Sequence, residues 1–64
     1  MIPTPARILL ADDHALVRTG LRMILDAEPD LQVVAEAADG YEALEALAGT
    51  PTDLAILDIA MPRM

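Results

Sequence analysis

Cysteine and lysine are both absent from this chain of 64 residues. Without cysteine there is no disulfide framework, no thiolate metal site and no cysteine nucleophile. Without lysine, the positive charge comes from four arginines, which face eleven acidic residues and leave a formal net charge of −7. A surface this acidic repels nucleic-acid phosphate, so we expect no direct nucleic-acid binding by this segment.

Aromatic residues and long apolar runs are also scarce. Tyr41 is the only aromatic residue, and no apolar run is long enough for a signal peptide or a membrane span. We therefore expect a cytoplasmic location without membrane association. Hydrophobic residues make up 55% of the chain, which favours folding over disorder, and the length allows one small domain or part of one.

Three short apolar segments predict β-strands. Residues 6–11, ARILLA, form a nearly continuous apolar run, as expected of a strand that is covered on both faces. Residues 31–37, LQVVAEA, are β-branched at their centre, which also favours a strand. Residues 53–57, DLAIL, are the third predicted strand.

A first helix is predicted over residues 15–27. Apolar residues recur there at helical spacing, while Arg18, Arg22 and Asp26 are placed to face water. Pro29 prevents the helix from continuing.

A second, shorter helix is predicted over residues 40–48. Asp39 can accept the first free amide hydrogens, and Glu42 can reach back toward the start of the helix, as in a capping box. Gly49 and Pro51 then form a stop signal, in which the glycine can adopt the left-handed conformation.

Strands and helices therefore alternate in the order β-α-β-α-β. Short connections between them favour an α/β fold with a doubly wound parallel sheet, right-handed crossovers and helices on both faces. With the first strand at the centre, the strand order is 2-1-3. The chain then reverses its direction between the first and third strands, and open α/β sheets bind ligands at such a switch point.

Three carboxylates follow strands whose carboxyl ends meet at that switch point. Asp12 and Asp13 come directly after the first strand, and Asp58 comes directly after the third. Two like charges about 4 Å apart repel by roughly 4 kcal/mol at an effective dielectric near 20, so the cluster requires a cation. Carboxylate oxygens suit Mg²⁺, and a carboxylate beside that ion can act as the nucleophile in phosphoryl transfer.

Structural roles are the alternative for each acidic residue taken alone. Asp13 is placed to cap the first helix, but three acids at the ends of adjacent strands favour a binding site. His14 has no second histidine or cysteine nearby, so we interpret it as a loop residue rather than a metal ligand. Asp53 lies five residues before Asp58, roughly 16 Å away along an extended strand, and is expected outside the cluster.

The segments ILLADDHALVRTGLRMIL, VVAEAADGYEAL and DLAILDIAMP carry a specific resemblance. With them the chain resembles the first half of a response-regulator receiver domain of two-component signalling, in the subgroup that precedes a LuxR-type helix-turn-helix. The resemblance covers residues 7–64 and includes the D-x-x-M-P pattern that begins at Asp58. It implies a flavodoxin-like fold, of which residues 1–64 would be a partial receiver domain with the output domain absent.

The resemblance also implies a role for each site residue. Asp58 would be the phosphoacceptor, Asp13 a direct Mg²⁺ ligand and Asp12 an acid that acts mostly through metal-bound water. The backbone carbonyl of Ala60 would complete the protein ligands. Receiver domains catalyse their own phosphorylation from a sensor histidine kinase or a small acyl phosphate, and their own dephosphorylation, and this subgroup controls transcription through a C-terminal DNA-binding domain.

The later half of such domains contributes a Ser or Thr and a Lys that contact the phosphoryl group, and this chain has no lysine. The alternative hypothesis is therefore a truncated half-domain that acts only as a folding or assembly unit, without phosphotransfer. Its third strand would have an apolar unpaired edge, for which we expect self-association.

Two other phosphate-related folds fit less well. Phosphatases of the haloacid dehalogenase type need a second Asp two residues after the nucleophile, where this chain has Ala60. A dinucleotide-binding fold needs a glycine-rich turn after the first strand, where this chain has Asp12 and Asp13.

Overall fold

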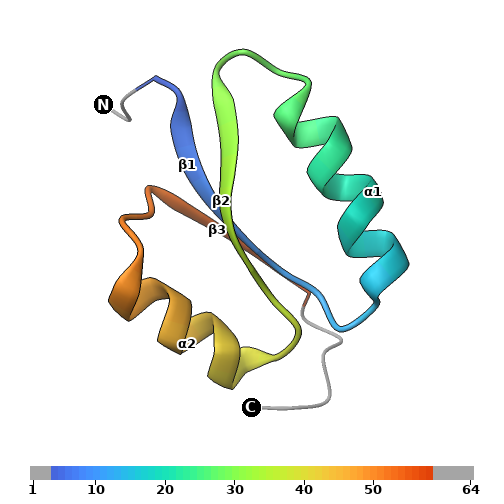
Figure 1. Cartoon of the computed structure of the whole chain (residues 1–64), viewed down its shortest axis with the longest axis vertical. Helices are drawn as coiled ribbons and strands as arrows, with labels where there is room; N and C mark the ends of the chain where they lie inside the picture. The colour runs from blue at the N-terminus through green and yellow to red at the C-terminus, as the bar shows by residue number, and fades with distance from the viewer. Residues whose placement is uncertain (1–3, 59–64) are drawn as a thin grey trace.

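The computed structural model describes residues 4–58, which form five alternating strands and helices (Figure 1). In chain order these are β1 (Ala6–Ala11), α1 (Ala15–Asp26), β2 (Leu31–Ala37), α2 (Gly40–Gly49) and β3 (Leu54–Leu57). Neither α1 nor α2 has the length and apolar character that a helix needs to span a membrane.

The three strands form one parallel sheet in the order β2-β1-β3, which confirms the predicted α/β topology. Helices α1 and α2 lie on opposite sides of this sheet (Figure 1). Strand β1 is central, and its residues Ile8, Leu9 and Leu10 expose 1% of their surface or less. This burial explains why β1 is apolar from Ile8 to Ala11 instead of alternating with polar residues.

Small side chains form the core between the sheet and α2. The buried cluster contains Leu9 and three alanines, and two further alanines pack against it; the alanines are Ala11, Ala35, Ala37, Ala43 and Ala46. Because alanine projects only a methyl group, the backbone of α2 packs close to the sheet. Ala11 and Ala37 are the last residues of β1 and β2, so this packing holds the carboxyl ends of those two strands against α2.

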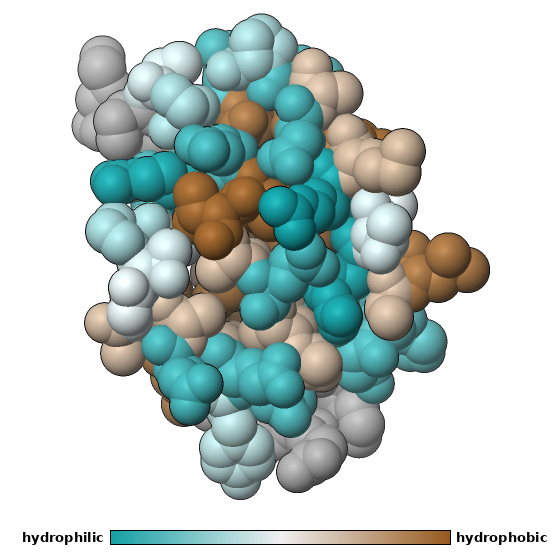
Figure 2. Space-filling model, viewed as in Figure 1, coloured by the Kyte–Doolittle hydropathy of each residue, from teal (hydrophilic) through white to brown (hydrophobic). Residues whose placement is uncertain are grey.

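Helix α1 is attached to the sheet by partly buried apolar side chains together with polar contacts to β2. None of its residues is fully buried; Leu21 and Leu25 are half-buried, whereas Val17 and Ile24 expose 50% and 66% of their surface. Apolar side chains accordingly reach the surface among hydrophilic ones on the face shown in Figure 2.

The sequence pattern predicted that the polar side of α1 faces water, but side chains on this side also contact β2. Arg18 Nε donates a hydrogen bond to Glu36 Oε1 on β2 at 3.0 Å. Asp26 Oδ1 accepts a hydrogen bond of 2.9 Å from the amide of Val33, also on β2. Arg22 and Asp26 are exposed, as predicted, whereas Arg18 is largely covered. The difference arises because β2 presents a carboxylate to Arg18, and helical periodicity alone does not reveal such a partner.

Helix α2 begins as predicted but ends differently. Asp39 Oδ1 accepts a 2.9 Å hydrogen bond from the amide of Glu42, whose own Oε1 accepts one from the amide of Ala38 at 2.9 Å. Gly49 does not use the left-handed conformation that the sequence pattern allowed: it lies in the last turn of α2, and no described glycine has a positive φ. Thr50 follows with extended backbone, so the helix ends without a left-handed residue.

Candidate metal centre

The carboxyl ends of the three strands are held side by side by backbone hydrogen bonds. The amide of Asp58 donates to the carbonyl of Ala11 at 2.9 Å, which joins the end of β3 to the end of β1. The amide of Asp12 donates to the carbonyl of Ala37 at 3.0 Å, which joins the end of β1 to the end of β2. Parallel pairing thus brings the residues that follow β1 and β3 to one edge.

Asp12 is a buried acid, with 6% of its surface exposed. Its carboxylate Oδ1 accepts a hydrogen bond of 2.8 Å from the amide of His14, two residues further along the chain. Asp and Asn side chains commonly stabilise turns in this way. The bond fixes the Asp12 carboxylate inside the turn between β1 and α1.

Asp13 does not cap α1, so the structural alternative for this residue is wrong. The N-cap position belongs to His14, whose side chain makes no capping hydrogen bond. Instead, His14 Nδ1 lies 2.8 Å from Asp13 Oδ1 and 3.5 Å from Asp12 Oδ1. His14 is a loop residue, as predicted, but it also contacts both acids. Its position directly after Asp12 and Asp13 is the feature of the sequence that indicates this contact.

One ligand atom from each of Asp12, Asp13, His14 and Asp58 lies within 4.8 Å of the others. Oxygen ligands that bind Mg²⁺ or Ca²⁺ at 2.0–2.6 Å lie at most about 4–5 Å apart across the ion. The three carboxylates are therefore close enough for one hard cation, and their donor chemistry suits it. Asp12 is buried, Asp58 is half-buried and Asp13 and His14 are exposed, so this site is open to solvent on one side.

Two further residues considered in the sequence are not among the described residues of the cluster. Asp53 was predicted to begin the third strand, but it directly precedes β3, near the amino ends of the strands, where its amide donates to the carbonyl of Arg7 at 2.8 Å. Ala60, whose backbone carbonyl was predicted to complete the metal ligands, lies outside the described residues.

Arg18 contributes to the acidic turn although the sequence pattern assigned it to the solvent-facing side of α1. Its Nη1 donates a hydrogen bond of 2.7 Å to the backbone carbonyl of Asp12. Arg18 comes six positions after Asp12 and lies at the end of the first turn of α1. The spacing is the only sequence signal for this contact, and it does not distinguish the contact from an exposed arginine.

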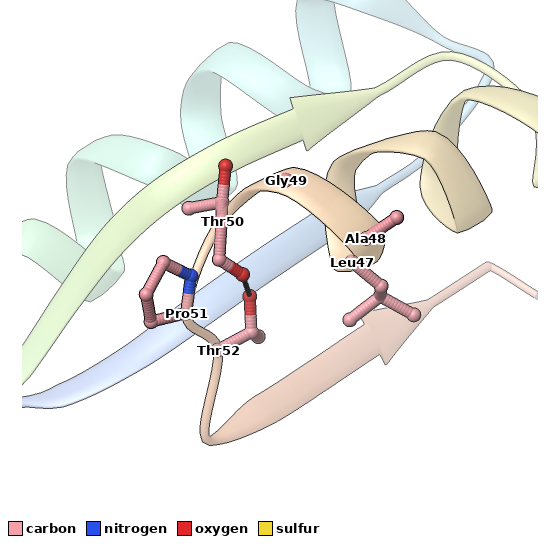
Figure 3. A pocket seen from close by; sticks show the side chains of 6 residues that line it. All are labelled: Leu47, Ala48, Gly49, Thr50, Pro51 and Thr52. Carbon is pink, nitrogen blue, oxygen red and sulfur yellow. Dashed lines mark hydrogen bonds between the residues drawn. The ribbon is translucent and has the colours of Figure 1, made fainter.

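A pocket in the described part of the chain is separate from the acidic cluster. It is lined by the end of α2 and the loop that leads into β3 (Figure 3): Leu47, Ala48, Gly49, Thr50, Pro51 and Thr52. Because that loop precedes β3, the pocket lies toward the amino ends of the strands. The pocket is therefore not part of the candidate metal centre.

Known proteins match this chain along most of its length. The family model of the response regulator receiver domain matches residues 8–64. The oxygen regulatory protein NreC of Staphylococcus epidermidis is 52% identical over 56 residues, which cover 88% of this chain and 26% of that protein. The chain thus spans about a quarter of the length of this curated relative.

Solved structures share the fold. A chain in the crystal structure of the P1 domain of CheA3 in complex with CheY6 from R. sphaeroides superposes with a TM-score of 0.91 and 43% identity, over 97% of this chain and 49% of that one. The response regulator domain of Thermotoga maritima CheB gives a TM-score of 0.86 and 41% identity, over 92% of this chain and 44% of that one. The resemblance inferred from the sequence is confirmed, and the chain belongs to the response regulator receiver domain family.

Proposed function

We propose that this chain is the phosphoacceptor part of a two-component response regulator, in which Asp58 accepts a phosphoryl group from a sensor histidine kinase. The observation that carries the proposal is the meeting of Asp58 with Asp12 and Asp13, within 4.8 Å, at the carboxyl edge of the sheet. The family supports it, and so does the structural neighbour that occurs in a complex with the P1 domain of CheA3.

The residues that would hold Mg²⁺ are Asp12, Asp13 and Asp58, together with the backbone carbonyl of Ala60. When bound, the ion would offset part of the negative charge of these carboxylates and of an incoming phosphoryl group. His14 is not part of this ligand set, because Mg²⁺ prefers oxygen over imidazole nitrogen. Its contact with Asp13 Oδ1 would give way when the ion binds.

In the proposed transfer a carboxylate oxygen of Asp58 attacks phosphorus in line with the leaving group. A new O–P bond forms, and the P–N bond to the imidazole of the kinase breaks. The imidazole nitrogen keeps the electron pair of that bond and is reprotonated from water. Attack of water on the acyl phosphate later returns the Asp58 carboxylate and inorganic phosphate.

Acetyl phosphate with Mg²⁺, followed by intact-mass measurement, tests this proposal on the chain itself. We expect the chain to gain one phosphoryl group, and Asp58→Asn to gain none because an amide is a poor nucleophile. Glu45→Gln is the matched control, since it removes one carboxylate from an exposed position on α2. An adduct that persists in Asp58→Asn, or a wild-type chain that gains no adduct, contradicts the proposal.

The wider role is also part of the proposal. The curated relative NreC is a regulatory protein about four times as long as the matched segment, since that segment covers 26% of it. By analogy, a response regulator of this kind acts in the cytoplasm and controls transcription through a C-terminal DNA-binding domain of the LuxR type. DNA binding would then belong to that domain and not to this acidic segment.

One observation favours the second hypothesis, a folding or assembly unit without phosphotransfer. Within residues 4–58, β3 pairs with β1 and with no other strand, and Leu54 and Leu57 expose 44% and 54% of their surface. Such an edge is a template for pairing with another chain. Self-association in a concentration series by analytical ultracentrifugation, with no Asp58-dependent adduct, would support this hypothesis; a monomer at all concentrations contradicts it.

A further inference from the structure

We propose that Arg18 is a positioning residue for the metal-binding turn: it orients the Asp12–Asp13 peptide so that the acidic side chains face the ion. This inference rests on the proposed Mg²⁺ site. The observation behind it is the hydrogen bond of 2.7 Å from Arg18 Nη1 to the backbone carbonyl of Asp12. Only 20% of the Arg18 side chain is exposed, so this arginine is held in place and does not extend into solvent.

The guanidinium completes a set of hydrogen bonds around Asp12. The amide of Asp12 donates to Ala37, and its carboxylate accepts from the amide of His14. The carbonyl of Asp12 accepts from Arg18. With these three groups engaged, the plane of the peptide that leads into Asp13 is set from both sides. The direction in which the Asp13 side chain leaves the backbone depends on that plane.

Glu36 holds Arg18 in the required position. Arg18 Nε donates to Glu36 Oε1 at 3.0 Å, and Glu36 pairs with Leu10 in the register of β1 and β2, two residues before Asp12. Arg22 donates to the other oxygen of the same carboxylate. The planar guanidinium of Arg18 thus spans a carboxylate on β2 and a carbonyl after β1, a geometry that a lysine ammonium does not reproduce.

A positioning role and a purely electrostatic role of Arg18 predict opposite changes in metal affinity when Arg18 is removed. A positive charge near a cation site weakens metal binding, so removing it should strengthen binding if charge alone matters. Arg18 directs its bond to a neutral carbonyl, and Glu36 offsets its charge. If Arg18 positions the turn, removing it should weaken metal binding instead.

The experiment measures Mg²⁺ dissociation constants of the full chain by isothermal titration calorimetry, alongside thermal unfolding without metal. Loss of a residue that orients metal ligands typically lowers affinity by about 10- to 100-fold, so we expect a loss of about 10-fold for Arg18→Ala. Arg22→Ala removes the same charge from the same helix without touching Asp12, so it should not weaken binding in this way. Arg18→Lys, which keeps the charge and the apolar stem, should fall between wild type and Arg18→Ala.

The outcomes separate this inference from the proposed function. Equal or tighter Mg²⁺ binding by Arg18→Ala, or an equal loss in Arg22→Ala, overturns the positioning role and leaves the Mg²⁺ site intact. If Arg18→Ala does not fold, the comparison uses Arg18→Lys, and wild-type affinity in that variant overturns the role. A wild-type chain that binds no Mg²⁺ overturns both proposals together.

Discussion

Arg7 and Asp53 form a two-pronged ion pair across the amino ends of β1 and β3. Arg7 Nε donates to Asp53 Oδ2 at 3.1 Å, and Arg7 Nη2 donates to Asp53 Oδ1 at 3.2 Å. The backbone amide of Arg7 also donates to Asp53 Oδ2, at 2.8 Å. The pair joins residues 46 positions apart and fixes the edge of the sheet that lies opposite the acidic cluster.

This pair predicts how stability depends on pH. The side-chain hydrogen bond from Arg7, followed by its backbone hydrogen bond and its charge, lowers the pKa of Asp53, while Arg7 has a raised pKa and stays charged. Because the pKa of Asp53 is lower in the folded state, the ionised carboxylate stabilises the fold at pH values above the ordinary Asp pKa of about 3.9. This contribution is lost as the pH falls through the pKa that Asp53 has in the folded state. We expect Asp53→Asn to be less stable than wild type at pH 7, and we expect this difference to shrink as the pH falls below about 3.9.

Denaturant titrations of both chains at several pH values check this prediction. Glu45→Gln is the control, because it removes an exposed carboxylate that lies away from Arg7 on α2. A difference between wild type and Asp53→Asn that stays constant from pH 7 to pH 3 would contradict the assignment of the effect to this ion pair.

Metal binding should stabilise the fold through Asp13 and not through His14. A ligand that binds only the folded state at 100 times its dissociation constant raises the free energy of unfolding by about 2.7 kcal/mol. We expect Mg²⁺ to raise the thermal midpoint of wild type and of His14→Ala, because imidazole nitrogen is a poor Mg²⁺ donor. In Asp13→Asn, which replaces a charged ligand by a neutral amide, most of that increase should disappear.

Thermal unfolding with and without Mg²⁺ measures the effect for each variant. An increase in Asp13→Asn equal to that of wild type would place the ion elsewhere. Loss of the increase in His14→Ala would contradict the prediction and would show that His14 contributes to Mg²⁺ binding.

The start of α2 gives a separate prediction about stability. Asp39 Oδ1 accepts a hydrogen bond from the amide of Glu42, an amide that has no partner within the helix. Removing such a cap typically costs about 1 kcal/mol, so Asp39→Ala should lower the thermal midpoint by roughly 4–8 °C in a chain of this size. Asp39→Asn keeps an oxygen acceptor and should unfold close to the wild-type midpoint; equal losses in both variants would show that charge rather than capping is responsible.

Local patterns in the sequence determined most of the fold. The apolar run before Asp12 predicted a buried strand, and β1 is the buried centre of the sheet. Asp39 and Glu42 predicted the start of α2, and Asp39 caps it. Alternation of short strands with helices predicted a parallel sheet with right-handed crossovers, and the order 2-1-3 followed once the first strand was taken as the centre. The convergence of Asp12, Asp13 and Asp58 follows from the same topology.

Only the tertiary structure decided which partners the charged residues have. Arg18 and Asp26 match an exposed helix face, yet they contact Glu36 and Val33 on β2. Asp53 is a strand-end acid like Asp58, yet it pairs with Arg7 at the opposite edge of the sheet. Helical and strand periodicities describe one element at a time, whereas an ion pair depends on two elements that are distant in sequence. The sequence by itself therefore determined where the acidic site lies, and tertiary packing decided which arginine reaches it.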